Sequence, residues 1–261
     1  MDLHLDGHRI LVVGASEGIG FATARGLARE GARVTLAARR PAPLAEAARR
    51  IADETGQSVD QAVVDVTDAA SVQALVDAWQ GPLDALVVAT GGSRRARFET
   101  LDDEAWLHNY EHNLLGGVRL VRGLLPRLRA GNAPRVLFFG GAAAKMPYPN
   151  QVVSNVHKAG LIALTKTLAA ELAPEGIRVN AICPGRTLTR LWQTRAEALA
   201  QEQSRPVEAV IAHFAAEIPL GRFAEADEIA DVATFVLSPR AGYLVGQSIN
   251  VDGGIARGLL S

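Results

Sequence analysis

Three glycines near the start of the chain, Gly14, Gly18 and Gly20, are the residues whose spacing first suggests a chemical role. They follow the apolar run 10–13, which predicts a strand buried on both faces, and they precede a predicted helix that continues through Leu27. Glycines at such a junction let the backbone turn tightly, and the N-terminus of the helix directs free N–H groups at a bound anion. The pattern therefore predicts a phosphate-binding loop, with the spacing G-x-x-x-G-x-G in place of the commoner G-x-G-x-x-G.

The end of the second predicted strand, 33–38, indicates which dinucleotide would suit this loop. NAD-binding folds of this type usually carry a carboxylate there, but this chain has Ala38 followed by Arg39 and Arg40. Because a guanidinium suits a ribose 2′-phosphate, we expect NADP(H) rather than NAD(H). The alternative is that the two arginines are ordinary solvated charges at the head of the next helix. Glu17, inside the glycine loop, is the one residue that counts against NADP(H).

Strands and helices alternate along the whole chain, which predicts an α/β fold. We expect a single doubly wound Rossmann-type domain over 1–261, with a seven-stranded parallel sheet, helices on both faces and the ligand at the carboxyl ends of the strands. Residues 190–217 form a polar, mostly helical excursion from this alternation. The predicted strands are 10–13, 33–38, 61–64, 83–89, 135–139, 178–183 and 247–251, and the main helices between and after them are 43–54, 69–79, 106–129, 152–172 and 227–237.

Composition and charge exclude several classes of function. Hydrophobic residues make up 48% of the 261, enough for a large core, and the formal net charge of −1 gives no reason to expect nucleic acid or a membrane as a partner. The single cysteine, Cys183, allows no disulfide within the chain and fits a reducing compartment. The N-terminus lacks the signal-peptide pattern, and no uncharged run reaches the ~18 residues of a membrane span. We therefore expect a soluble cytoplasmic protein.

Over essentially its whole length the sequence resembles the short-chain dehydrogenase/reductase family, and within it the 3-oxoacyl-carrier-protein reductases. The motifs that carry this resemblance are GASEGIG (14–20), the pair Asp65 and Val66, HNLLGG (112–117), KAGLIALTKTLAAEL (158–172), IRVNAICPG (177–185) and GQSINVDGG (246–254). The resemblance implies that the glycine loop lines the pyrophosphate, that Asp65 and Val66 flank the adenine, and that residues 184–189 cover the nicotinamide. The implied cofactor-binding residues are Gly14, Ser16, Glu17, Gly18, Ile19, Gly20, Arg39, Arg40, Asp65, Val66, Gly91, Lys158, Pro184, Gly185, Thr187 and Thr189.

At its chemical centre the chain departs from the pattern of that family. Members carry a Ser after the fifth strand, a Tyr-x-x-x-Lys on the following helix and a helper Asn. In this sequence Lys158 and Asn113 match, whereas Gly141 and Ser154 stand at the Ser and Tyr positions. The family's Lys lowers the pKa of the phenol from ~10, so that the Tyr exchanges a proton with the carbonyl oxygen during hydride transfer. Because an alkyl hydroxyl is shorter and far less acidic, we do not expect Ser154 to replace the phenol directly.

Other groups near this centre could supply the proton. Lys158, acting through a water held by Asn113, is the most economical source. Tyr148 lies in a segment that borders the substrate pocket in the family, although an aromatic flanked by two prolines is also typical of an ordinary loop. Lys145 is expected to be solvated, and His157 to face a neighbouring helix or subunit. The candidate catalytic residues are therefore Lys158, Asn113, Ser154 and Tyr148, and no metal is expected.

Three functions remain open. The first, which we favour, is an NADP(H)-dependent oxidoreductase of a small carbonyl or alcohol compound with a rearranged proton path. The second is a non-redox enzyme on the same scaffold, such as a dehydratase or isomerase. The third is a catalytically silent NADP(H)-binding protein.

Further expectations concern assembly and the substrate side of the protein. The resemblance implies a homodimer or homotetramer, assembled through helices 106–129 and 152–172 and the tail around 252–254. It also implies that 190–217 is a substrate lid, whose apolar Trp192, Ile211 and Phe214 indicate an apolar part of the ligand. In the segment after the fourth strand, Arg94, Arg95 and Arg97 are expected to be solvated rather than to guide an acidic substrate.

Overall fold

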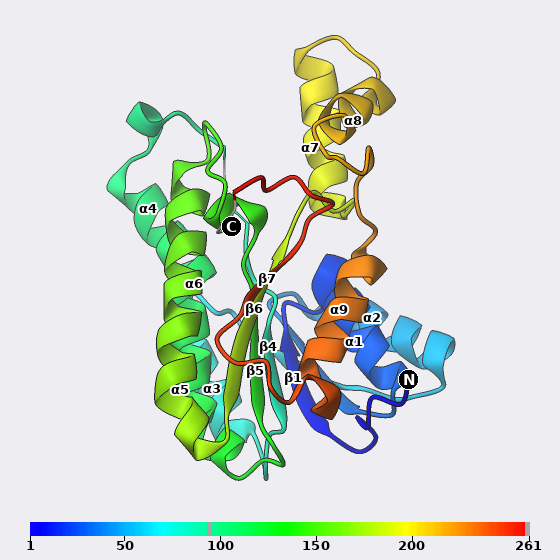
Figure 1. Cartoon of the computed structure of the whole chain (residues 1–261), viewed down its shortest axis with the longest axis vertical. Helices are drawn as coiled ribbons and strands as arrows, with labels where there is room; N and C mark the ends of the chain where they lie inside the picture. Colours follow the sequence, from blue (N-terminus) through cyan, green and yellow to red (C-terminus); the bar gives the residue numbers. More distant parts are fainter. Residues whose placement is uncertain (93–94, 259–261) are drawn as a thin grey trace.

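A single parallel sheet forms the centre of the computed structural model, which describes residues 1–92 and 95–258 (Figure 1). Its strand order is β3-β2-β1-β4-β5-β6-β7, and all six neighbouring pairs are parallel. The predicted seven-stranded parallel sheet is therefore confirmed. The strands are β1 Arg9–Val13, β2 Arg33–Ala38, β3 Asp60–Val63, β4 Ala85–Val88, β5 Arg135–Phe139, β6 Arg178–Pro184 and β7 Ser248–Val251.

Helices cover both faces of the sheet, because successive residues of each central strand point to opposite sides. In β1, Ile10 and Val12 join the core under α1, α2 and α9, whereas Leu11 and Val13 join the core under α3, α5 and α6. Figure 1 shows these two groups of helices on opposite sides of the strands. Those helices are α1 Gly18–Arg29, α2 Pro41–Thr55, α3 Ala69–Ala78, α5 Gly116–Arg129, α6 Val152–Leu172 and α9 Ala226–Leu237.

The predicted helix 106–129 is not one regular helix. It consists of α4 (Asp103–Tyr110), a π-helical turn (Glu111–Leu115) and α5. The turn buries Asn113, whose Nδ2 donates to the carbonyl oxygens of Asn109 and Gly92, both at 3.0 Å. A π-turn of this kind often marks a functional site, and here it presents a polar side chain to the end of β4. The short 3-10 turns are Phe98–Thr100, Ala142–Ala144, Ala173–Glu175 and Pro239–Ala241.

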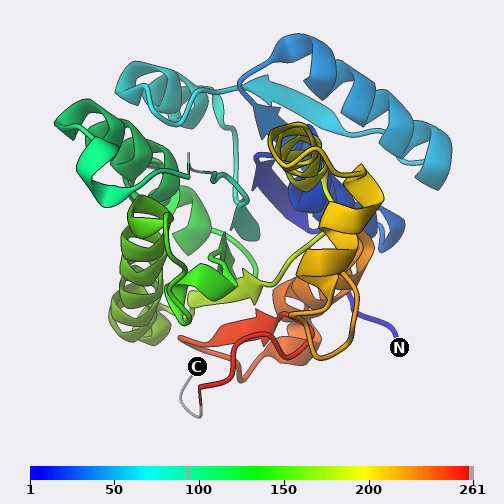
Figure 2. The ribbon, with the colours of Figure 1, turned by 90° about the horizontal axis from the view of Figure 1, so that it is seen from above.

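The excursion 190–217 contains two helices, α7 (Arg190–Glu202) and α8 (Val207–Ala215). They stand beyond the carboxyl ends of the strands (Figure 1), and Figure 2 shows them over that end of the sheet. Trp192 packs edge-on against Phe214, with ring centroids 5.4 Å apart, and Ile211 joins the same small cluster. The same cluster includes Phe223 and Ile255, so it also joins this segment to the rest of the chain. None of the described helices is long and apolar enough to cross a membrane.

Candidate functional site

A cleft of about 560 Å³ runs across the carboxyl ends of the strands, with α7 above it. It lies between β1 and β4, where the order of strand addition switches from one side of β1 to the other. Its size is typical of a small-molecule site. The structure brings every sequence-predicted cofactor residue to the wall of this cleft. They are Gly14, Ser16, Glu17, Gly18, Ile19, Gly20, Arg39, Arg40, Asp65, Val66, Gly91, Lys158, Pro184, Gly185, Thr187 and Thr189.

The glycine loop is shaped by backbone that other residues would not tolerate. Gly14 has φ of +87°, and a Cβ there would lie 2.7 Å from the carbonyl oxygen of Ala89. A Cβ on Gly20 would overlap the carbonyl oxygen of Gly14. The first turn of α1 has no side-chain cap from its N-cap residue, Glu17, so its N–H groups remain available to an anion. This end of the cleft fits a pyrophosphate.

Two arginines flank the adjacent part of the cleft. Arg40 lies 3.5 Å from Glu17 and Arg39 lies 3.9 Å from Asp65, measured between the closest nitrogen and oxygen atoms. Exposed ion pairs of this length contribute little, so both guanidinium groups remain free to bind a ribose phosphate. Glu17 lies beside Arg40 and remains the one residue that counts against such a phosphate.

Asp65 stays ionised at this end of the cleft. Burial alone would raise the pKa of its carboxyl, but hydrogen bonds from the hydroxyl and N–H of Thr67, together with the charge of Arg39, outweigh burial and lower the pKa below its usual value. The resulting carboxylate holds the turn after β3 in place beside the predicted adenine site.

A buried hydroxyl lies farther along the cleft. Thr187 Oγ1 has no hydrogen-bond partner within 1–92 and 95–258, although the residue is only 3% exposed. Buried polar atoms are normally satisfied, so an orphaned one on a cleft wall favours a ligand with a complementary polar group. Together with the glycine loop and the two arginines, this hydroxyl makes the residues present fit a dinucleotide with a phosphorylated ribose.

Lys158 lies at the end of the cleft away from these arginines. It is buried on α6, and its Nζ donates to the carbonyl oxygen of Phe139 at 2.9 Å. Burial lowers the pKa of this amine to about 8. A Cβ on Gly91 would lie only 2.7 Å from Nζ and 3.3 Å from Asn113 Oδ1, so glycine is required between them. An amine with this pKa can exchange protons near neutral pH.

Asn113 does not reach the surface of the cleft. Besides the two bonds donated by its Nδ2, its Oδ1 accepts from the N–H of Gly92 at 3.2 Å. The amide is therefore occupied by backbone groups and fixes the loop that passes Lys158. These bonds show that Asn113 holds this loop, and its role of holding a water for Lys158 stays a prediction.

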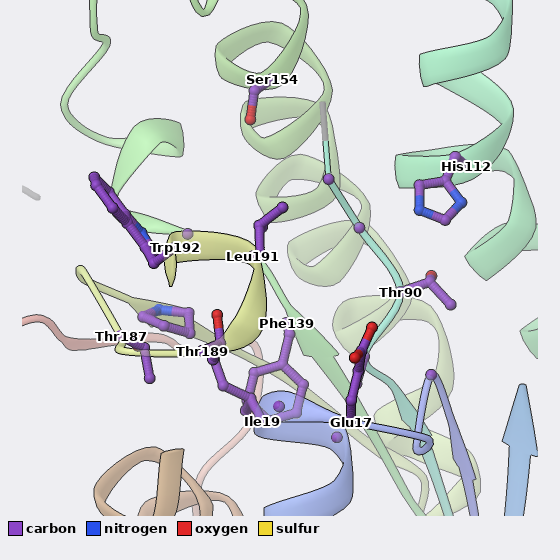
Figure 3. A pocket seen from close by; sticks show the side chains of 18 of the residues that line it. Glu17, Ile19, Thr90, His112, Phe139, Ser154, Thr187, Thr189, Leu191 and Trp192 are labelled. Carbon is purple, nitrogen blue, oxygen red and sulfur yellow. The ribbon is translucent and has the colours of Figure 1, made fainter. Parts of the chain in front are cut away.

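Ser154 and Tyr148 both line the cleft. Ser154 lies one turn before Lys158 on α6, and Figure 3 shows its side chain directed into the cleft. Tyr148 is half-buried; burial raises the pKa of its phenol, which therefore stays protonated at neutral pH. Its carbonyl oxygen accepts from Asn155 Nδ2 at 2.9 Å, so Asn155 holds the loop of Tyr148. At Gly141 a Cβ would meet nothing within 4 Å.

Two other candidate proton donors lie outside the cleft. His157 is buried against α4, edge-on to Trp106 with ring centroids 5.8 Å apart, as expected of a residue that faces a neighbouring helix. Lys145 was expected to be solvated, but its Nζ donates to the carbonyl oxygen of Ser248 at 2.6 Å. That bond fixes the lysine against β7, so the expectation is wrong.

His112 is a cleft residue that was not predicted from the sequence, although it adjoins Asn113 in the HNLLGG motif. Figure 3 shows its ring on the opposite side of the cleft from Trp192. Burial lowers the pKa of this imidazole, and the charge of Lys158 adds to the effect, so the ring is neutral at neutral pH. The π-turn brings His112 to the cleft, and no local pattern in the sequence predicts such a turn.

The arginines after β4 fall into different places. Arg95 lines the cleft and is exposed, as expected of a solvated residue, and Arg97 is exposed and pairs with Glu99. Arg94 lies outside the described residues.

The described lining of the cleft includes six arginines and Lys158 against two carboxylates, so the cleft is strongly positive in a nearly neutral protein. The six are Arg39, Arg40, Arg95, Arg186, Arg190 and Arg195.

Comparison with known proteins places the chain among relatives of nearly equal length. A protein-family profile described as Enoyl-(Acyl carrier protein) reductase matches residues 14–256. The 3-oxoacyl-acyl-carrier-protein reductase FabG of Escherichia coli (strain K12) is 32% identical over 256 residues, which cover 97% of this chain and 99% of the relative.

Two solved structures are also similar over almost their whole length. L-Sorbose reductase from Gluconobacter frateurii, complexed with NADPH and L-sorbose, is 35% identical with a TM-score of 0.95, covering 99% of this chain and 100% of that one. The NADPH-bound short chain oxidoreductase from Pseudomonas aeruginosa PAO1, described as containing an atypical catalytic center, is 32% identical with a TM-score of 0.88. That match covers 97% of this chain and 99% of the other.

Proposed function

Because the chain belongs to the short-chain dehydrogenase/reductase family, we propose that it uses NADP(H) to reduce a small carbonyl compound or to oxidise the corresponding alcohol. The observation that carries this proposal is the single cleft that joins the glycine loop to the buried amine of Lys158. Two similar solved structures contain NADPH, which supports the choice of nucleotide.

Each part of the nucleotide has a chemical partner in the cleft. The N–H groups at the start of α1 would bind the pyrophosphate, and Arg39 and Arg40 the ribose 2′-phosphate. The free hydroxyl of Thr187, with Thr189 beside it, would bind the carboxamide of the nicotinamide. When bound, the nucleotide supplies or accepts the hydride, and the chain's own residues orient the reactants and move the proton.

Lys158 is the group we assign to that proton. With a pKa of about 8, its ammonium is abundant at neutral pH and still acidic enough to protonate a developing alkoxide, directly or through water. The carbonyl oxygen of Phe139 holds the amine in place. Tyr148, with its phenol, is the second candidate donor at the same end of the cleft. The hydroxyl of Ser154 lies one turn from Lys158.

A catalytically silent NADP(H)-binding protein is the second candidate function. The observation that favours it is the pair Gly141 and Ser154, which stand where the family carries its Ser and Tyr. Losing a positioned general acid typically lowers a rate by ~10² to 10⁴, which leaves room for hydride transfer driven by the orientation of the reactants alone.

Deuteride transfer distinguishes the two functions. The protein is incubated with 4-deuterated NADPH and a panel of ketones and aldehydes, and the products are examined for deuterium by mass spectrometry. The oxidoreductase predicts labelled alcohol, reduced in Lys158→Ala and raised in the double variant Gly141→Ser/Ser154→Tyr, which restores the family's groups; the open space at Gly141 accommodates the serine. Tight NADPH binding without label in any product would instead support the silent protein.

We also propose that the chain assembles with copies of itself through α4 and α6. Leu107, Tyr110 and Val156 on these helices are exposed large hydrophobic residues, with 62%, 37% and 50% of their surface accessible. Burial of such side chains against a second copy would remove apolar surface from water. Light scattering coupled to gel filtration tests this: a dimer or tetramer supports it, and a monomer at micromolar concentration contradicts it.

A further inference from the structure

Three arginines surround one indole ring at the lid end of the cleft. The guanidinium carbons of Arg95, Arg186 and Arg195 lie 6.0, 5.8 and 4.2 Å from the ring centroid of Trp192. All four residues line the cleft, and Figure 3 shows Trp192 on its wall. The three come from the loop after β4, the loop after β6 and helix α7, so the fold gathers them from distant parts of the chain. We call them the arginine cluster.

The charge of the arginine cluster is only partly matched. Arg186 is bonded to the carboxylate of Glu217 and to the carbonyl oxygen of Phe214. For Arg95 and Arg195, no carboxylate lies within 4 Å in the described parts of the chain. Burial lowers the pKa of Arg95 to about 10, with Arg186 adding to the effect, and the group is still charged at neutral pH. The cluster therefore keeps about two unmatched positive charges in a partly enclosed cleft.

Stacking on aromatic rings explains the position of these arginines but not their charge. Arg195 contacts Trp192 and also Phe214, whose ring centroid is 5.3 Å away. A guanidinium that stacks on a ring presents its flat face to it and leaves its N–H edge free. That edge is the part of arginine that binds a carboxylate or phosphate in two parallel hydrogen bonds. Because neither Arg95 nor Arg195 has a carboxylate partner in the described residues, the two form an incomplete anion site beside Trp192.

We propose that the arginine cluster binds an anionic group, a carboxylate or a phosphate, carried by the substrate. This inference deepens the proposed function and rests on it for the reaction at the other end of the substrate. The arginine cluster and Lys158 line the same cleft, so a substrate would place its oxyanion against Arg95 and Arg195 and its carbonyl at Lys158. Tyr148, whose electrostatic neighbours include Arg95 and Arg186, lines the same cleft and offers a contact for the substrate.

The test uses pairs of ligands in which one member carries the anionic group and the other carries it as an ester or lacks it. The carboxylate pair is 4-oxopentanoate and its methyl ester, and the phosphate pair is dihydroxyacetone phosphate and dihydroxyacetone. Binding to the full chain saturated with NADPH is measured by calorimetry, and turnover is measured separately. At least one anionic member should bind about 10- to 100-fold more tightly than its neutral partner, as expected for charge-assisted hydrogen bonds. The pair that shows the preference identifies the anion.

The variants Arg95→Gln and Arg195→Gln should each reduce that preference, and the double variant should abolish it. Arg97→Gln is the matched control, because Arg97 is exposed beside Glu99 and outside the cleft. An equal affinity for anionic and neutral members, or a preference that survives the double variant, would overturn the proposal. Binding without turnover would contradict the oxidoreductase function while leaving the anion site supported, so the two failures are distinguishable.

Discussion

The two ends of the cleft contact a ligand through different groups: backbone at the glycine loop and side chains around Lys158. At the first end the ligand would contact mostly backbone: the turn at Gly14 and Gly20 and the uncapped start of α1. At the second end the contacts are side chains from separate segments, namely Lys158, Tyr148 and the arginine cluster. Side chains change by single substitutions without altering the fold, so the chemistry of the second end is free to diverge while the first stays fixed.

The largest expected effect on nucleotide affinity contrasts a glycine from each end. Gly20→Ala should weaken NADPH binding by about 100-fold, because its Cβ would overlap the carbonyl oxygen of Gly14 and the loop must shift. Gly141→Ala is the control, since its backbone is extended and its Cβ would meet nothing within 4 Å; its affinity should stay within about twofold. Calorimetric titration with NADPH measures both. Similar losses in the two variants would break the comparison between the ends.

The largest expected effect on the rate of hydride transfer comes from the loss of the buried amine. Lys158→Met should lower the rate of hydride transfer by about 10² to 10⁴ at saturating NADPH, because it removes the proposed proton donor. Single-turnover fluorescence of NADPH measures this rate. The neighbouring His157→Gln is the control, since His157 packs against α4 outside the cleft. A rate for Lys158→Met close to that of the native chain would show that the proton comes from elsewhere.

The same amine affects stability. Burial lowers the pKa of Lys158 to about 8, below the 10.5 of an unperturbed lysine, so the unfolded chain binds more protons between these values. The free energy of unfolding should therefore rise with pH from about 8 to about 10.5 through this group, and this rise should be absent in Lys158→Met. Urea unfolding at several pH values provides the measurement. Identical pH dependence of the free energy of unfolding in both proteins would count against a lysine that loses its proton near pH 8 in the folded chain.

A smaller effect is expected at the nucleotide end. Arg39→Gln and Arg40→Gln should each weaken NADPH binding by about 10-fold or more and leave NADH binding nearly unchanged, because only NADPH carries the 2′-phosphate. Arg49→Gln, an exposed change on helix α2, which begins just after the two arginines, is the control. Equal weakening of both nucleotides would mean that the two arginines do not select between them.

The smallest effect is expected for Tyr148→Phe. If Lys158 is the principal proton donor, removing this phenol should lower the rate of hydride transfer by less than about 10-fold, mainly through weaker substrate contact. The ratio of kcat to KM for both proteins measures the change. A loss as large as that of Lys158→Met would move the proton donor from the lysine to the tyrosine.

Local patterns in the sequence were sufficient for the sheet and for the first end of the cleft. Apolar runs such as 10–13 predict buried strands, and glycines at a strand–helix junction predict a phosphate loop, because both depend on neighbouring residues. Most residues of the predicted nucleotide set reach one cleft because they follow the ends of parallel strands, which meet at one edge of the sheet; Lys158 reaches it from α6.

The other end depended on contacts that no local pattern contains. Arg95 is exposed as expected, but its place beside Trp192 depends on how α7 crosses the cleft. The π-turn that buries Asn113 likewise results from packing of the loop at Gly92 against the helix. Lys145 was expected in solvent because its bond to Ser248 joins residues about 100 positions apart.

The most direct test of the account is the pH dependence of deuteride transfer from 4-deuterated NADPH in single turnovers. For the native chain we expect a rate that is constant at low pH and falls about tenfold per pH unit above about 8, where Lys158 loses its proton. Lys158→Met should give a slow rate without that break. A break at the same pH in both proteins, or a native rate independent of pH, would contradict the assignment of Lys158 as the proton donor.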